Sequence, residues 1–384
     1  MISRTAAWIA LSLAVLAAGC EQKWDMAERP VQDEELDAAF FSGLDSKEIA
    51  DVPEPASLRP CCIFGNDVGA QVGSIPVPGY EITYTLELDT LGTHQFNKGT
   101  IALQPRGQER ILSDEVSGIL YTCRGGFIDI AHVRDNADRT LYLVSQIGRI
   151  AVTGGTIPIS GEGAKRRVVV KPVDPRLVRT YGLREVVTSL AEWLDYQAGI
   201  WHEITTWYGW SSTPFSEQPS AFSPEDLYSN LVGAKIAGTI IRRQAAPSEV
   251  AYNRAVTALL RDALIKLGPK LYPWKLMDAR SFSTLPAAQK EFDRYCRGDW
   301  KPLGLSIPDR LGDVPFRVMA TLEIEPGELL VKNGFPFPKR GSTMVTQDDF
   351  PGVIAAIERE ADKELGPGAG LPAARPNERS RYHQ

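Results

Sequence analysis

Histidine and acidic residues recur at helical spacing in two stretches of this chain of 384 residues. In the first stretch, Asp129, His132 and Asn136 lie at positions i, i+3 and i+7, so they would share one stripe of a helix. Asp135 lies at the border of that stripe. An Asp-x-x-His pair is a spacing at which two helical side chains converge on a metal ion. The pattern makes Asp129 a candidate ligand and His132 a candidate catalytic residue. On spacing alone the simpler interpretation is a solvated polar face, with His132 held by Asp129 or Asp135.

The second stretch carries His202 and Glu203 on a segment of helical periodicity. A zinc-peptidase motif of the His-Glu-x-x-His type needs a second histidine at position 206, where this chain has Thr206, so that reading is excluded. A metal site with ligands from several helices stays open, with His202 as a ligand and Glu203 as the general base. The alternative is a buried, hydrogen-bonded His–Glu pair with a structural role.

A third stretch combines a helix start with oxygen-bearing side chains. Ser223 is a good N-cap, Pro224 suits the first helical position, and Asp226 stands where a capping box places an acid. Capping alone explains this pattern. Asp226 and Asn230 also lie at the positive end of the helix dipole, where they are candidate metal ligands. The metal hypothesis requires His132, His202 and Asp226 to meet between three helices around a divalent ion such as zinc.

Cys123 supports a rival hypothesis, because it stands shortly before the first stretch and a helix N-terminus lowers the pKa of a thiol. Envelope cysteine peptidases that cut peptidoglycan stems also place a cysteine at a helix start. Their cysteine is followed by Ser-Gly, whereas Arg124-Gly125 follows here. A buried structural cysteine is the simpler interpretation.

The first 20 residues predict export and lipid attachment. Arg4 provides a short basic region, and residues 6–18 form an apolar run that only Ser12 interrupts. That run has signal-peptide length, whereas a membrane-spanning helix needs roughly 20 apolar residues. The run ends in Leu-Ala-Ala-Gly-Cys20, which resembles the lipobox of bacterial lipoproteins. We expect a signal peptide over residues 1–19 and a lipid anchor on Cys20 that holds the protein on a membrane of the cell envelope. An ordinary secretory signal with an incidental cysteine is the alternative.

Glu21 follows the predicted attachment site. An aspartate at that position tends to retain lipoproteins at the inner membrane, so its absence favours the outer membrane in a cell that has one. The net charge of −6 provides no basic footprint for nucleic acid. Apart from Cys20, four cysteines would reach an oxidising compartment, where three disulfide pairings are open.

The elements that must position these candidates predict an α+β fold, with strands near both ends of a mainly helical middle and one large domain. Residues 20–58 are polar and acidic, which is typical of a tether between the lipid and a domain over 59–365, and residues 366–384 are expected to form a disordered tail. Periodicity predicts strands over 80–91, 150–159, 166–173 and 316–331. It predicts helices over 127–147, 183–208, 223–243, 249–267, 287–295 and 350–365.

Three runs carry a resemblance to a known family: YTCRGGFIDIAHVRDNAD, WHEITTWYGW and FSPEDLYSN. They resemble a family of bacterial lipoproteins known as a domain of unknown function, number 4056, and the likeness covers roughly residues 58–365. The resemblance implies an envelope lipoprotein and implies no activity.

Two functions follow as hypotheses. The first is a metal-dependent hydrolase that acts on an envelope polymer or lipid. The second is a non-catalytic lipoprotein that binds glycan, peptide or a protein partner through an aromatic-rich helical surface. Five aromatic residues within 18 positions suggest that surface, although such residues more often belong to a packed core: Trp193, Trp201, Trp207, Tyr208 and Trp210.

Overall fold

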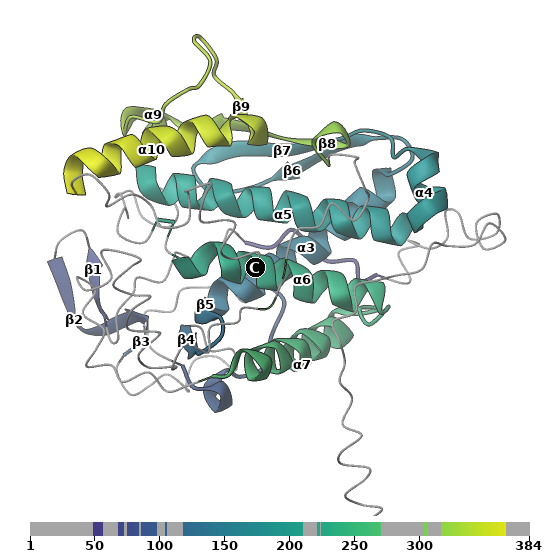
Figure 1. Ribbon diagram of the computed structural model, residues 1–384, viewed down its shortest axis with the longest axis horizontal. Helices are drawn as coiled ribbons and strands as arrows, with labels where there is room; N and C mark the ends of the chain where they lie inside the picture. Colours follow the sequence, from purple (N-terminus) through teal and green to yellow (C-terminus); the bar gives the residue numbers. More distant parts are fainter. Residues whose placement is uncertain are drawn as a thin grey trace, which may run out of the picture.

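The computed structural model describes residues 49–56, 68–72, 75–83, 86–97, 104–105, 118–209, 221–222, 224–269, 303, 305 and 316–365. Within them a four-stranded antiparallel sheet lies above a layer of long helices, and a further helix, α7, lies below (Figure 1). This is the predicted α+β architecture, with strands at both ends of a helical middle. Cys20, the predicted signal peptide, the predicted tail and the predicted helix over 287–295 lie outside the described residues.

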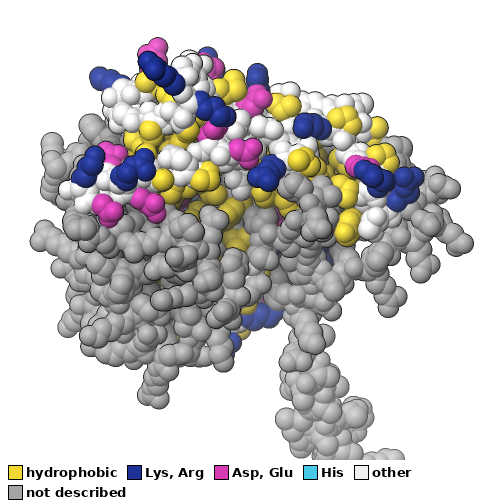
Figure 2. All heavy atoms as spheres, turned by 45° about the horizontal axis from the view of Figure 1, so that its top comes forward, with side chains coloured by type: hydrophobic (Ala, Val, Ile, Leu, Met, Phe, Trp, Pro, Cys, Tyr) yellow, Lys and Arg dark blue, Asp and Glu magenta, His cyan; other side chains and the backbone are white. Residues whose placement is uncertain are grey.

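The upper sheet has the strand order β6-β7-β8-β9, formed by β6 (Gly155–Ile159), β7 (Ala164–Val170), β8 (Ala320–Pro326) and β9 (Val345–Thr346). Its inner face is apolar apart from the buried Arg166, whereas Arg167 and Glu323 pair across the strands on the outer face. On the face shown in Figure 2, the described residues of the upper part mix basic, acidic and hydrophobic side chains. The predicted strand over 316–331 ends at Pro326, after which α9 (Glu328–Lys332) forms.

Three helices make the layer under the sheet: α3 (Ile130–Ile150), α5 (Leu183–Tyr208) and α6 (Pro224–Arg242). The short α4 (Pro175–Tyr181) leads into α5, and α7 (Glu249–Leu267) packs on α6. On the upper side, α10 (Phe350–Leu365) contacts α5. The predicted bounds of α5, α7 and α10 are confirmed. None of the described helices combines the length and apolar character that a membrane crossing requires.

The start of α3 differs from the prediction. A hairpin of β4 (Ile119–Thr122) and β5 (Gly126–Asp129) precedes the helix, so Phe127 and Asp129 lie on a strand. Every residue of both strands is buried, and a strand buried on both faces is an uninterrupted apolar run that periodicity cannot separate from a helix. The helix begins at Ile130.

The remaining strands form a second small sheet of β1 (Val68–Val72), β2 (Ile75–Thr83) and β3 (Gln104–Pro105). The strand predicted over 80–91 therefore ends at Thr83, and a short 3-10 turn (Leu88–Thr90) occupies its second half.

The predicted tether is shorter than expected, because residues 49–56 belong to the folded body. Ile49, Ala50 and Val52 are buried, and the N–H of Ala50 donates to the carbonyl of Ala246 at 2.8 Å. The body thus begins no later than Ile49, ten residues before the predicted boundary at 59.

The α3–α6 contact depends on a residue without a side chain. A Cβ atom added to Gly233 would lie 2.2 Å from the carbonyl oxygen of Val133, so the two helix backbones touch. We expect Gly233→Ala to lower the free energy of unfolding by about 1–3 kcal/mol, as overpacked cores do. Urea unfolding followed by circular dichroism measures this. The control is Gly352→Ala on α10, where the added Cβ would be 3.8 Å from its nearest neighbour and the free energy should change by less than about 1 kcal/mol. Equal effects of the two substitutions would contradict the close contact.

Candidate metal centre

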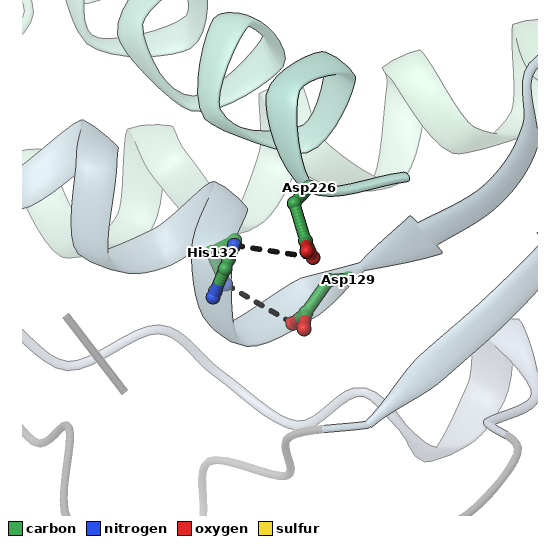
Figure 3. A group of neighbouring side chains, drawn as sticks. All are labelled: Asp129, His132 and Asp226. Atoms are coloured by element: carbon green, nitrogen blue, oxygen red, sulfur yellow. Dashed lines mark hydrogen bonds and ion pairs between the residues drawn. The ribbon is translucent and has the colours of Figure 1, made fainter. Parts of the chain in front are cut away.

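Asp129, His132 and Asp226 meet where α3 and α6 begin (Figure 3). Each offers one ligand atom, these atoms all lie within 4.8 Å of one another, and all three residues are fully buried. The His132 Nδ1 atom is 3.5 Å from the Asp226 Oδ1 atom. Two ligands held about 2.1 Å from a tetrahedral ion are about 3.4 Å apart, so this spacing fits a shared metal ion.

His132 is the unusual member of the group. The residue has no exposed surface, yet neither of its ring nitrogens makes a hydrogen bond in the described part of the chain. The 3.5 Å approach to Asp226 is an ion-pair distance that fails the geometry of a hydrogen bond. Buried polar atoms are nearly always bonded to protein, water or an ion. We therefore expect a bound partner, such as a metal ion, at the His132 imidazole.

Asp129 is fixed by the helix start. It is the N-cap of α3, with extended backbone, and its Oδ1 atom accepts the N–H groups of Ala131 and His132 at 2.8 and 3.1 Å. Its own N–H donates to Ser229 Oγ on α6 at 2.9 Å. Asp129 and His132 therefore meet through a cap rather than through the predicted shared helical stripe. A carboxylate can cap a helix with one oxygen and bind an ion with the other.

Asn230 ties the helices together. Its Oδ1 atom accepts a hydrogen bond from Asn136 Nδ2 at 2.6 Å, and the same amide nitrogen donates to the His132 carbonyl at 2.7 Å. The candidate oxygen of Asn230 is thus engaged with α3. Asp226 is placed as predicted, in the first turn of α6, whereas its neighbour Ser223 lies outside the described residues.

His202 lies beside the centre and outside the three-residue group. Its ring meets that of His132 edge to face, with centroids 5.3 Å apart. Its Nδ1 atom is 3.5 Å from Glu162 Oε1. The structure therefore places this predicted ligand in a layer around the centre, where a carboxylate faces the imidazole.

Glu162 is the residue that the sequence analysis missed. It lies in the turn between β6 and β7, between two glycines, where nothing in the sequence predicts contact with α5. Burial alone would raise the pKa of its carboxyl, but Arg166, His202 and Arg139 offset this and hold the pKa below its ordinary value. Arg166 binds it at 2.9 Å.

The other residues predicted as site candidates lie outside the three-residue group. The Glu203 carboxylate accepts the backbone N–H of Phe222 at 2.8 Å, in the turn before α6. Asp135 is buried but is not a member of the three-residue group. Cys123 is disulfide-bonded, so the free-thiol hypothesis is wrong. The aromatic residues Trp201, Trp207 and Tyr208 are buried and belong to the core rather than to a binding surface.

More charge is buried behind the centre. Arg139 binds Asp195 and lies 4.0 Å from Glu162. Burial raises the pKa of Asp195 to about 7, although Arg139 acts in the opposite direction. Between α5 and α6, Glu192 pairs with both Lys235 and Arg242. Arg242 pairs with Glu185 as well, so the ion pairs continue along α5 and α6.

The lowered pKa of Glu162 gives a pH dependence. Because the folded state binds this proton more weakly than the unfolded state, its stabilisation is present above the ordinary pKa of about 4.3 and is lost as the pH falls through and below that value. We expect Glu162→Gln to cost roughly 3–5 kcal/mol at pH 7, since Arg166 is left buried without its partner. The difference from the wild type should shrink between pH 5 and 3.

Urea unfolding at several pH values measures both quantities. The matched control is Glu323→Gln, whose partner Arg167 has a half-exposed side chain, and which should cost about 0–1 kcal/mol. A Glu162→Gln cost that stays constant with pH would contradict the assignment.

A family model described as "Protein of unknown function (DUF4056)" matches residues 49–273, which is more than half of the chain. No curated protein and no solved structure matches the chain.

Proposed function

We propose that this chain, which belongs to the DUF4056 family, is a metal-binding lipoprotein of the cell envelope in which Asp129, His132 and Asp226 hold one divalent ion. One observation carries the proposal. His132 is completely buried, and its ring nitrogens make no hydrogen bond in the described part of the chain. Oxygen atoms of two carboxylates lie within 4.8 Å of one of these nitrogens.

Charge and donor type support the same conclusion. Two aspartates and a neutral imidazole balance the charge of a divalent ion, which lowers the cost of burying the carboxylates. Imidazole and carboxylate ligands together suit zinc and similar borderline ions. The separation of up to 4.8 Å in the group exceeds the tetrahedral value of about 3.4 Å, so binding would draw one ligand inward.

Hydrolysis of an envelope polymer or lipid stays a prediction. Three protein ligands leave one tetrahedral position for water or substrate, as in catalytic zinc sites. Against this, His132, His202 and Glu203 are all fully buried, and a polymer must reach the metal to be cut. The geometry therefore supports metal binding more strongly than catalysis.

The envelope location rests on the amino-terminal sequence. The apolar run, the lipobox-like ending and Cys20 support lipid attachment. The disulfide at Cys123 supports an oxidising compartment, which export would provide.

The metal centre is tested by zinc titration of the purified full chain. We expect one zinc ion per chain and a rise in melting temperature on binding, because the ion binds the folded state alone. His132→Ala and Asp226→Asn should each weaken zinc binding more than about 100-fold. This exceeds the loss of about 10–100-fold that is typical when a residue that only orients a ligand is replaced. Isothermal titration calorimetry and metal analysis after dialysis measure this.

Asp135→Asn is the matched control for these variants, because it removes a buried carboxylate from the same helix and leaves the three-residue group intact. Its zinc affinity should equal that of the wild type. A wild-type protein that retains no zinc, manganese, iron or cobalt ion would end the proposal.

Lipid attachment is tested separately with Cys20→Ser. We expect the variant to lose incorporated radiolabelled palmitate and to leave the membrane fraction, because the acyl acceptor is absent. Ser12→Ala, within the apolar run, is the control and should keep both properties. Unchanged palmitate labelling of the Cys20 variant would remove the lipoprotein part of the proposal.

A further inference from the structure

Phe222 has a backbone conformation that a bulky residue rarely adopts. Its φ is 57°, in the left-handed region, and only 1% of the residue is exposed. Such a conformation is strained and persists where surrounding contacts hold it. Its N–H group donates to Glu203 Oε2 at 2.8 Å, and both residues are buried. Glu203 thus supplies one contact that holds the strained turn.

This turn determines how the chain enters α6. Phe222 lies two residues before the first residue of α6 and four before Asp226. The direction in which the chain leaves Phe222 therefore affects where the first turn of α6 places the Asp226 carboxylate.

The same first turns are held from α3. Ser229 Oγ accepts the N–H of Asp129 at 2.9 Å, and Asn230 accepts from Asn136 at 2.6 Å. These bonds fix α6 on the side of α3, whereas Glu203 reaches the turn before α6 from α5. With both sides held, Asp226 faces His132.

We propose that Glu203 is a positioning residue of the metal centre, which keeps Phe222 in its left-handed conformation and so places Asp226 against His132. This inference rests on the proposed metal centre. It gives the His202–Glu203 pair two separate tasks: His202 lies against the ring of His132, and Glu203 acts on the backbone that carries a ligand.

Loss of the acceptor has two consequences. The buried N–H of Phe222 loses this partner, and the strained φ loses a contact that compensates it. The turn then relaxes and moves Asp226, and metal ligands tolerate only small displacements. Replacing a residue that orients a metal ligand typically weakens metal binding 10–100-fold, so we expect zinc affinity to fall by about that factor.

The experiment compares zinc affinity in the full chain for Glu203→Ala, Glu203→Asp and Glu203→Gln. Alanine removes the acceptor, and aspartate keeps the charge but is too short to reach Phe222. Glutamine keeps the length and a carbonyl acceptor without the charge. We expect alanine and aspartate to weaken zinc binding about 10–100-fold and glutamine to bind within about threefold of the wild type.

A matched control separates positioning from general loss of stability. Gln347 Oε1 accepts the buried N–H of Leu322 at 2.7 Å, in the sheet and away from the centre. Gln347→Ala also deletes a side-chain acceptor from a backbone amide, and it should lower the melting temperature of the metal-free protein without changing zinc affinity.

The outcomes are distinct. Failure of the wild type to bind any metal ends the proposed function itself. Wild-type binding with unchanged affinity in the alanine and aspartate variants overturns the role of Glu203 alone. Equal weakening in the glutamine variant also overturns it, because the carboxylate charge would then be the determinant. Should the alanine variant not fold, the aspartate and glutamine variants decide.

Discussion

The contact between the backbones of α3 and α6 is the constraint on which the rest of the interior depends. Gly233 lets the two helices touch at Val133, and this closeness allows short side chains to bridge them. Ser229 reaches the N–H of Asp129, and the Asn136 amide reaches Asn230. With a larger residue at position 233 these bonds would stretch. The site therefore depends on a helix–helix distance as much as on its own residues.

Buried charge is the second feature of this interior. Glu192 pairs with Lys235 and Arg242, and it lies against Gly238, where an added Cβ atom would fall 1.8 Å from its Oε1. Glu162 and Arg166 form a similar pair near the centre. Charges removed from water are tolerated only when each has partners in good geometry. The helical layer is thus held in one arrangement by polar contacts that leave few alternatives.

Much of the fold could be predicted from the sequence, because long helices show apolar residues at a regular helical spacing. The bounds of α5, α7 and α10 agree with the prediction, and so does the position of Asp226 in the first turn of α6. The start of α3 could not be predicted, since the doubly buried β5 has no alternating pattern. As a result, Asp129 was predicted to lie within the helix, whereas it is the N-cap residue of α3.

The limits at the site have a different cause. A polar stripe on a helix shows which residues share a face but not how deep that face lies. The stripe of His132 was expected at a solvated surface or a metal site, whereas a buried His–Glu pair was one of the two interpretations for His202; both histidines are fully buried. Glu162 had no signal, because its role arises only when the β6–β7 turn reaches α5. Such a meeting of distant segments is a property of topology and cannot be read from local spacing.

The contacts of the segment 49–56 have a mechanical consequence under the lipid anchor that we propose at Cys20. Asp51 pairs with Arg149 at the end of α3, Ala50 bonds to Ala246 between α6 and α7, and Glu54 holds Ser160 beside β6. A pull from the amino-terminal side would load these attachments in chain order, beginning with the bond between Ala50 and Ala246. With the lipid anchor that we propose at Cys20, tension on the chain would therefore meet α3, the connection between α6 and α7, and the end of β6.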